Sequence, residues 1–319
     1  MTILQEGTIT TKLEGVAALH IIQNRLSIQD PDFLSSSLAD FIYATIRQEG
    51  RSGCVIGNSG GVDSALVAAL ARRSLDKKDI HLFFLPERDT HKDSRADAYL
   101  VAEKLGLTMQ EINITSILRK MGVYRLEPPA ALFPRSIQER YSRAVHKRLE
   151  NTESSVFLQM LRGGGTPELQ KHMAYYSTKN RVRMAMLYHH AELTNSLVLG
   201  TCNRSEKMTG LFIKYGDGAC DIAPLDSLYK TQVFKLAEHL DVPREIIEKV
   251  PIGDLAPGIS DESTLKLPYE KLDMILAGFE LGVSDEEIEA VANVTRAEID
   301  HVRCMVEASD SMRHGPYYP

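Results

Sequence analysis

Long apolar runs, closely spaced cysteines and an excess of positive charge are all missing from this chain of 319 residues. No segment reaches the ~18 consecutive apolar residues that a membrane helix needs, and the opening MTILQEGTITTKLEG lacks the order of a secretory signal. We therefore expect a cytoplasmic protein that does not bind membranes. The formal net charge of -6 argues against broad binding to nucleic acid, although a local basic pocket stays possible.

The few cysteines exclude two further classes. They are far apart and form no CxxC pair, so neither a zinc site nor a disulfide framework is indicated. We interpret all four as buried free thiols: Cys54, Cys202, Cys220 and Cys304.

What the sequence does contain is an alternation of strand and helix patterns. Four apolar runs have the length of buried strands, at residues 54–56, 80–85, 108–114 and 196–200. Helical spacing separates them, over residues 62–73, 93–105 and 178–193. Repeated βα units predict an α/β fold in which helices cover both faces of a parallel sheet, with ligands at the carboxyl ends of the strands.

The turn after the first predicted strand is GNSGGVDS, residues 57–64. The Gly60-Gly61 pair lets successive N–H groups face outward and the next helix adds its positive end, which makes an anion cradle. No lysine follows, so the turn is not GxxxxGK[ST]. Ser59 and Ser64 can add hydroxyl donors, and Asp63 beside phosphates makes sense chiefly with Mg²⁺ between them. The alternative is an ordinary glycine-rich turn that caps a helix.

SGGVDS after a buried strand resembles the pyrophosphate loop of the ATP-pyrophosphatases, which use ATP to adenylate an acid or carbonyl oxygen. Later blocks resemble the ammonia-dependent NAD synthetase family, in family order: KNRVRMAMLY (179–188), LVLGTCNRSE (197–206), KYGDGACDIAPL (214–225), LYKTQVFKLAEHLDVPREIIEK (228–249) and LAPGISDE (255–262). The resemblance implies an adenine nucleotide alpha hydrolase-like fold and a ligase that converts deamido-NAD, ATP and ammonia into NAD, AMP and pyrophosphate.

The resemblance also implies a division of the chain. Residues 1–50 would form two helices that pack against the sheet of the core, because helical patterns run through 16–26 and 33–46. Residues 51–265 would form the ATP-pyrophosphatase domain, with a helical insertion at 120–175. Residues 266–319 would be a helical segment of the same domain.

Roles for individual residues follow from the resemblance alone. Contacts to ATP are implied for Gly57, Asn58, Ser59, Gly60, Gly61, Val62, Asp63, Ser64, Thr201 and Lys230. Mg²⁺ would be held by Asp63 and Glu206, and deamido-NAD by Arg181, Lys214 and Asp221. The residues expected to act in catalysis are Asp63, Lys230 and Lys214.

Several of these side chains have a plainer interpretation. Glu206 could support the first turn of a helix, and Lys214 and Lys230 could be solvated surface charges. Arg181 and Arg183 lie two positions apart on one predicted helix, so at most one of them is expected to face the site.

The implied chemistry needs no side-chain nucleophile, because joining a carboxylate to AMP makes it open to attack by ammonia. An acyl-adenylate hydrolyses readily, so we expect residues 204–225 to close as a lid. Position 2 is Thr2, which excludes a glutaminase with an N-terminal cysteine. Free ammonia or a separate glutaminase is the implied donor, and the resemblance favours a homodimer.

Departures from the family pattern affect acceptor recognition more than the ATP loop. The stretch at 120–175 is longer than expected and is basic, through Arg135, Arg140, Arg143, Lys147 and Arg148. It is either a solvated helical hairpin or part of an altered acceptor pocket or dimer contact. Ile252 and Ala256 replace a serine and a tryptophan of the family, and Arg313 and His314 only loosely match its acid-binding basic pair. The alternative function is amidation of a different carboxylic acid by the same chemistry.

Three other classes stay open. Residues 283–309 look like two short helices joined by a turn, with Ser284 and Thr295 as N-caps, but the segment is acidic for a helix-turn-helix DNA reader. An enzyme that modifies tRNA would normally show sulfur-handling cysteines or a basic domain. A regulatory relative that binds ATP without catalysis is the third, and acid-dependent release of pyrophosphate would rule it out.

Overall fold

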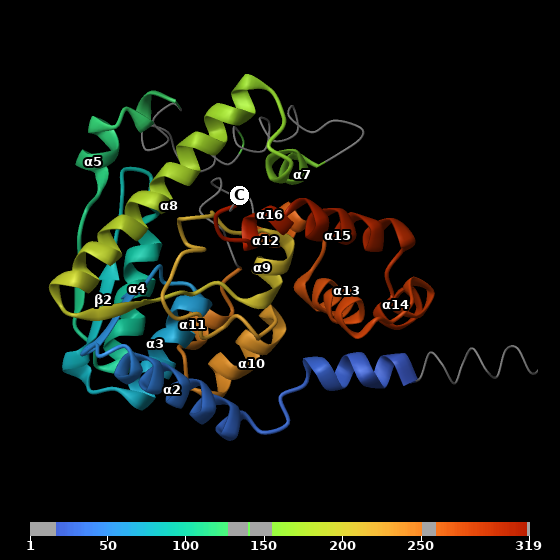
Figure 1. The fold of residues 1–319 in the computed structure, drawn as a ribbon, viewed down its shortest axis with the longest axis horizontal. Coiled ribbons are helices and arrows are strands. Elements are labelled where there is room, and N and C mark those ends of the chain that lie inside the picture. Colours follow the sequence, from blue (N-terminus) through green and yellow to red (C-terminus); the bar gives the residue numbers. More distant parts are fainter. Residues whose placement is uncertain (1–16, 127–139, 141–154, 251–259, 318–319) are drawn as a thin grey trace, which may run out of the picture.

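Four parallel strands form the centre of the molecule, in the spatial order β3-β2-β1-β4. The computed structural model describes residues 17–126, 140, 155–250 and 260–317 (Figure 1). The strands are β1 (Gly53–Gly57), β2 (Ile80–Phe84), β3 (Met109–Glu111) and β4 (Ser196–Leu199). β1 lies between β2 and β4, with Cys54 opposite Ile80 on one side and Leu197 on the other. The predicted α/β fold with a parallel sheet is confirmed.

Helices enclose this sheet and extend away from it. The chain before β4 contributes α2 (Pro31–Gln48), α3 (Val62–Ser74), α4 (Lys92–Leu105), α5 (Thr115–Lys120), α7 (Val156–Leu161) and α8 (Pro167–Leu193). Short 3-10 turns occupy Lys77–Asp79 and Val123–Arg125. The second half contributes α9 (Arg204–Thr209), α10 (Lys230–His239), α11 (Arg244–Ile247), α12 (Asp261–Leu265), α13 (Tyr269–Leu281), α14 (Asp285–Ala292), α15 (Arg296–Ala308) and α16 (Asp310–Arg313).

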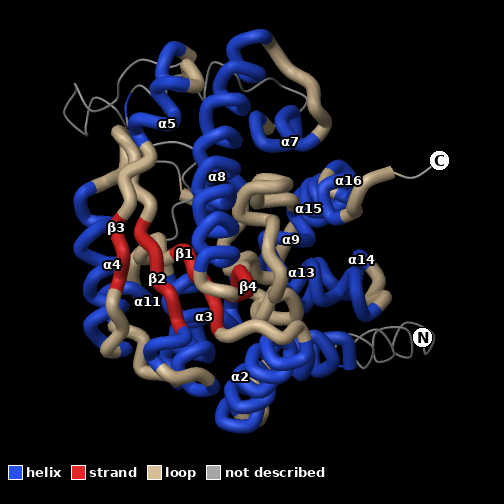
Figure 2. Tube along the Cα trace, turned by 60° about the vertical axis from the view of Figure 1, so that its left-hand side comes forward, coloured by secondary structure: helices blue, strands red, loops and turns tan. Residues whose placement is uncertain are grey.

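The two faces of the sheet are buried by different helices because side chains alternate along each strand. Cys54 and Ile56 of β1 belong to a core that includes α2, α3 and α10, whereas Val55 packs in a separate cluster with Met184 and Leu187 of α8. Figure 2 shows α8 running across one side of the strands and α3 lying behind them. Because both faces are covered, the carboxyl ends of the strands are the natural place for a ligand.

The C-terminal helices form a second apolar cluster beside the sheet. Leu272, Ile288 and Ile299, from α13, α14 and α15, are fully buried in it. Ile22, in the helical segment 17–26, joins the same cluster, whereas Ile42 and Ile46 of α2 pack in the sheet core. The two N-terminal helices therefore do not both pack against the sheet, as their similar patterns had suggested.

Most element boundaries agree with the sequence patterns, with two exceptions. The helix predicted at 178–193 is longer, because α8 begins at Pro167, where Thr166 caps it. Gly106 ends α4 in the left-handed conformation at φ 61, and Ser284 and Thr295 cap α14 and α15 as predicted. The strand predicted at 108–114 is shorter: β3 ends at Glu111, because Pro86, beyond the end of β2, has no N–H to donate to the next carbonyl.

Two of the four cysteines are buried as predicted, and some other predictions concern residues outside the described ranges. Cys54 and Cys202 are buried as expected. Cys220 and Cys304 are only half-buried, so for them the prediction is wrong. Four basic residues of the insertion, Arg135, Arg143, Lys147 and Arg148, lie outside the described residues, as do Ile252 and Ala256. Within the described ranges, no helix combines the length and apolar character required to cross a bilayer.

Candidate active site

The turn at 57–64 joins the carboxyl end of β1 to α3 and is held by its own side chains. Asn58 is buried, donates to the carbonyl of Ala98 at 2.9 Å, and accepts from the N–H of Gly60 at 3.1 Å. Gly60 has φ +80, and a Cβ there would lie 2.9 Å from the nitrogen of Ala98. Only glycine fits this position without strain, so the turn has a fixed shape before any ligand binds.

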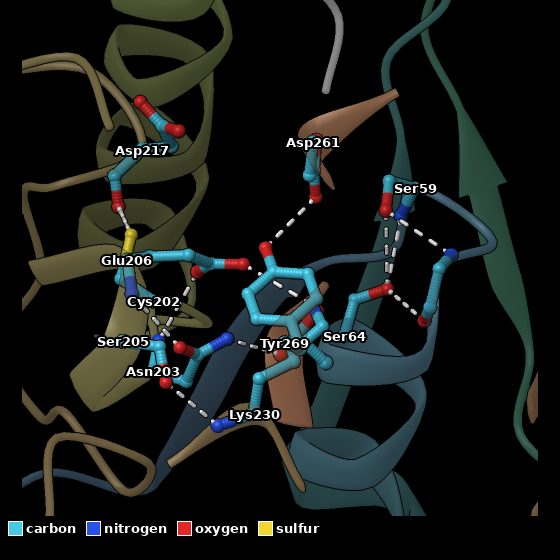
Figure 3. Close-up of polar contacts among 12 residues, drawn as sticks. Ser59, Ser64, Cys202, Asn203, Ser205, Glu206, Asp217, Lys230, Asp261 and Tyr269 are labelled. Atoms are coloured by element: carbon cyan, nitrogen blue, oxygen red, sulfur yellow. Dashed lines mark hydrogen bonds and ion pairs between the residues drawn. The ribbon is translucent and has the colours of Figure 1, made fainter. Parts of the chain in front are cut away.

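The two serines of the turn are placed differently. The hydroxyl of Ser64 is buried and donates to the carbonyl of Gly61 at 3.0 Å, so it supports the turn from inside. Ser59 is exposed and its Oγ accepts from the N–H of Gly61 at 3.2 Å (Figure 3). Of the two predicted hydroxyl donors, Ser59 is the one that reaches the surface.

Three predicted residues from distant parts of the chain meet beside this turn. The Nζ atom of Lys230 lies 2.6 Å from Oδ2 of Asp63 and 3.2 Å from Oε1 of Glu206. Asp63 lies in the first turn of α3, Glu206 lies on α9 after β4, and Lys230 begins α10. The structure therefore brings together the residues assigned to the metal ion and to pyrophosphate.

Burial sets the electrostatics of this group. The side chain of Lys230 is 2% exposed, and those of Asp63 and Glu206 are 18% and 14% exposed. Burial lowers the pKa of Lys230, but the charges of Asp63 and Glu206 outweigh it and raise this pKa above its ordinary value. Burial raises the pKa of Glu206 to about 8; Lys230 opposes the shift, and the negative charge of Asp63 adds to it. The solvated-lysine interpretation of Lys230 is wrong.

Asn203 belongs to the same group, although we did not predict it. Its Nδ2 atom donates to Oδ1 of Asp63 at 2.9 Å, while its Oδ1 accepts from the N–H of Glu206 at 3.0 Å. The carboxylate of Glu206 accepts a bond from the N–H of Asn203, which completes a capping box (Figure 3). The signal was present as N-x-x-E in the sequence, a helix start that fixes the cap and the third residue together. Glu206 therefore supports its helix and also faces Asp63.

Thr201 and Cys202 follow β4, the neighbour of β1. Thr201 lies at the carboxyl end of β4, on the same edge of the sheet as the turn at 57–64. Cys202 is buried and its thiol donates to the carbonyl of Asp217 at 3.3 Å. Burial raises the pKa of both Cys202 and Cys54, so both thiols stay protonated and serve as packing groups, as predicted.

Two of the three residues assigned to the acceptor also meet. The Nε atom of Arg181, on α8, donates to the carbonyl of Lys214 at 3.2 Å. The Nζ atom of Lys214 in turn donates to the carbonyl of Ser311 at 2.7 Å. Arg183 turns elsewhere and bonds the carbonyl of Leu85 at 3.2 Å, which confirms that the two arginines point in different directions.

Asp221, the third acceptor candidate, lies along the free edge of β4. Its Oδ2 accepts from the N–H of Val198 at 2.8 Å, and its Oδ1 accepts from the hydroxyl of Tyr188 at 3.3 Å. The first bond satisfies the N–H of Val198, and the backbone of Asp221 and Ile222 bonds the same edge of β4. Asp221 thus joins the predicted lid segment to the sheet and to α8.

The predicted lid, residues 204–225, is not one loop. Its first part is α9, capped by Asn203, and the rest consists of turns in which Tyr215 has φ 63. Arg313 fastens the C-terminal tail to α9, because its guanidinium donates to the carbonyl of Met208 at 2.9 Å and to Ser309 Oγ at 2.7 Å. Arg313 is therefore engaged with protein groups in this structure.

A second charged group at the end of β2 was missed. Lys179 of α8 is 4% exposed, and its Nζ lies 3.0 Å from Oε1 of Glu87 and 3.2 Å from Oδ2 of Asp89. Tyr124 donates to Oε2 of Glu87 at 2.8 Å and so links this group to the start of the insertion. The signal was the run ERD directly after Pro86, where a buried strand ends and charges need partners.

Two carboxylates that face one point at the rim of a phosphate-type cradle have the chemistry that Mg²⁺ prefers, since it binds hard oxygen atoms and shares them with phosphates. Asp63 and Glu206 therefore fit the ion in chemical type. Within the residues that the structure describes, no group of three or more His, Cys, Asp or Glu is placed to hold a metal.

The parallel sheet, the glycine-rich turn after an interior strand, and the charged group beside that turn are features of a nucleotide-binding α/β protein. The NAD synthase family model matches residues 34–140 and 151–316. The chain therefore belongs to the NAD synthase family.

Comparison with individual proteins supports this family membership. The chain is 44% identical to the NH(3)-dependent NAD(+) synthetase of Thermotoga maritima over 265 residues, which is 82% of this chain and 93% of that protein. Among solved structures, the NMN synthetase of Francisella tularensis matches with a TM-score of 0.67 and 26% identity, over 92% of this chain and 99% of that chain. The NH3-dependent NAD synthetase of Campylobacter jejuni matches with a TM-score of 0.64 and 26% identity, over 92% and 100%.

Proposed function

We propose that this protein is an ammonia-dependent NAD synthetase, which adenylates the carboxylate of deamido-NAD and lets ammonia displace AMP. The observation that carries the proposal is the meeting of Lys230, Asp63 and Glu206 beside the turn at 57–64, in a chain whose family membership is shown. A buried lysine between two carboxylates has little value for stability alone, because burying charges is costly. At the rim of a phosphate cradle it supplies the charge that departing pyrophosphate requires.

The first step transfers the adenylyl group. A carboxylate oxygen of the acceptor attacks the α-phosphorus of ATP, and the bond from that phosphorus to pyrophosphate breaks. The turn at 57–64 binds the phosphates at the positive end of α3, beside the exposed hydroxyl of Ser59. Lys230 stabilises the negative charge that grows on pyrophosphate.

The second step forms the amide. Ammonia attacks the acyl carbon, the bond to the AMP oxygen breaks, and the nitrogen loses a proton. AMP departs easily because it is a far better leaving group than oxide. No side chain forms a covalent bond, in keeping with the buried and protonated state of Cys202.

Mg²⁺ is part of the proposal, with Asp63 and Glu206 as its protein ligands. When bound, the ion would neutralise charge on the phosphates. Asn203 holds Asp63 beside the start of α9, and Lys230, which pairs with both carboxylates, would have to share them with the ion.

Acceptor binding is proposed for Arg181, Lys214 and Asp221. Arg181 and Lys214 lie within one chain of hydrogen bonds, between α8 and the C-terminal tail. Both are cations, so they suit the phosphates or the carboxylate of a nicotinic acid nucleotide. We propose that ammonia comes free in solution or from a separate glutaminase, and that the enzyme acts as a homodimer in the cytoplasm.

A second candidate acceptor is a mononucleotide. The Francisella tularensis protein, which matches 92% of this chain, is an NMN synthetase. The same adenylation and amidation would then act on the mononucleotide acid, which lacks the AMP half of deamido-NAD. Only the acceptor side of the site would differ between the two functions.

The test is to incubate the purified protein with ATP, Mg²⁺ and ammonium, and to offer each of the two acids separately. With deamido-NAD we expect AMP and the amide product in equal amounts. The amide should be lighter than the acid by the difference between a hydroxyl and an amino group. Turnover with the mononucleotide acid at a higher kcat/KM would instead establish the second function. Absence of AMP with either acid would contradict both.

A further inference from the structure

Asp273 is a buried carboxylate far along the chain from the nucleotide turn. It lies on α13 with no exposed surface, between Leu272 and Ile275 of the C-terminal apolar cluster. A carboxyl group in such surroundings is costly unless its oxygens accept hydrogen bonds. The hydrogen-bond partners of Asp273 therefore show which elements its carboxylate holds in place.

Both carboxylate oxygens of Asp273 bond to elements that carry the site. Oδ1 accepts from the hydroxyl of Ser205 at 2.5 Å, and Oδ2 accepts from the backbone N–H of Thr231 at 2.8 Å. The Oγ atom of Ser205 accepts from the backbone N–H of Lys230 at 2.9 Å (Figure 3). Asp273 and Ser205 thus satisfy the first two N–H groups of α10, and a negative charge there is also favoured by the helix dipole.

These bonds join the two helices whose side chains face the candidate phosphate site. Ser205 directly precedes Glu206 on α9, and Thr231 directly follows Lys230 on α10. Lys230 and Glu206 must approach within hydrogen-bond distance across the gap between those helices. A carboxylate that bonds both helices from behind fixes how the two side chains meet.

We propose that Asp273 is a positioning residue for adenylation, which sets Lys230 and Glu206 relative to each other through Ser205 and the first turn of α10. The inference rests on the proposed function for the reaction step that it serves. Asp273 touches neither the turn at 57–64 nor the acceptor residues, so its effect is transmitted through these helices.

Replacement by asparagine changes the hydrogen bonds while keeping the shape. If the amide oxygen faces Thr231, the hydroxyl proton of Ser205 loses its acceptor; if the amide is turned round, its NH₂ group opposes the N–H of Thr231. Asp273→Asn therefore removes the negative charge and, in either orientation, weakens one of the two links or reverses its direction. Loss of such a link to a charged group changes a rate or affinity by about ten- to a hundredfold.

The experiment compares wild type, Asp273→Asn, Ser205→Ala and the double variant. We expect Asp273→Asn to lower kcat and to weaken calorimetric binding of Mg²⁺-ATP by about tenfold or more, while KM for deamido-NAD stays unchanged. The double variant should lose little beyond either single variant, because both break one chain of contacts. The matched control is Asp285→Asn, whose carboxylate pairs with Arg296 and Arg303 in the same C-terminal segment without bonding α9 or α10.

A purely structural role gives a different result. Asp273→Asn would then lower the unfolding temperature, as Asp285→Asn is expected to do, but kcat per folded molecule and Mg²⁺-ATP affinity would match wild type, and the proposal would be wrong. If Asp273→Asn does not fold, Ser205→Ala decides by the same two measurements. Failure of the proposed function would appear in the wild type as no turnover with deamido-NAD, and Mg²⁺-ATP binding by the variants would still test the positioning role.

Discussion

The residues assigned to ATP and those assigned to the acceptor are held in different ways. Lys230 is 2% exposed and forms ion pairs with Asp63 and Glu206, each on an element that begins at the carboxyl end of a strand. Arg181 is exposed and Lys214 is half-buried, and both bond backbone carbonyls. Ion pairs that are buried on the sheet edge are fixed before substrate arrives, whereas long cations that bond carbonyls can exchange those bonds for a ligand at small cost.

This difference indicates where members of the family can diverge. Adenylation requires the same charges in the same place for any acid, which favours a rigid ATP side. Acceptor choice requires only that the bound acid presents its carboxylate to that side. The similarity of this chain to proteins described as an NMN synthetase and as NAD synthetases fits such a division.

The largest effect should come from removing a carboxylate on the ATP side. Asp63→Ala and Glu206→Ala should each reduce acceptor-dependent release of pyrophosphate by about a thousandfold or more, because charge neutralisation at the phosphates is lost. Glu248→Ala, which removes an exposed carboxylate from the end of α11, is the control. Near-native turnover in either site variant, with the fold intact by circular dichroism, would refute the metal assignment.

A smaller loss should follow from changing the shape of the turn. Gly60→Ala places a methyl group against Ala98 and Ser94 at a residue with φ +80, so we expect KM for ATP to rise by about tenfold or more. Gly122 has φ +79 but open space around it, so Gly122→Ala measures the strain without the clash. Equal KM values for ATP in the two variants would contradict a rigid cradle.

The acceptor side should respond more weakly and more selectively. Arg181→Ala should raise KM for deamido-NAD by about tenfold and leave KM for ATP nearly unchanged, because one charged contact is lost. Arg244→Ala, an exposed arginine on α11, is the control. Steady-state kinetics with each substrate varied in turn would decide, and equal losses for both substrates would place Arg181 outside the acceptor pocket.

The smallest effect should come from the thiol nearest the site. Cys202→Ala should leave kcat within about twofold of wild type, since its protonated thiol packs against the chain and takes no part in the chemistry. A large loss of kcat without loss of folded protein would show that the thiol does take part.

The ATP side could be predicted from sequence further than the acceptor side. Short signals such as SGGVDS and a lysine at a helix start are local, and the parallel sheet brings their elements together by rule. Asp273 gave no local signal, because its role depends on α13 packing behind α9 and α10. The cluster of Lys179, Glu87 and Asp89 likewise depends on where α8 crosses the end of β2. The helical patterns of residues 17–26 and of α2 are alike, so the sequence did not show that the first packs on the C-terminal helices and the second on the sheet.

The central claim is that this site activates its acid as an acyl-adenylate. The most direct measurement uses deamido-NAD with heavy oxygen in both positions of its carboxylate, followed by mass spectrometry of the AMP formed. Attack of the carboxylate on the α-phosphorus predicts one heavy oxygen in each AMP, because that oxygen stays on phosphorus when ammonia takes the acyl carbon. AMP without the label, formed together with NAD, would contradict the account.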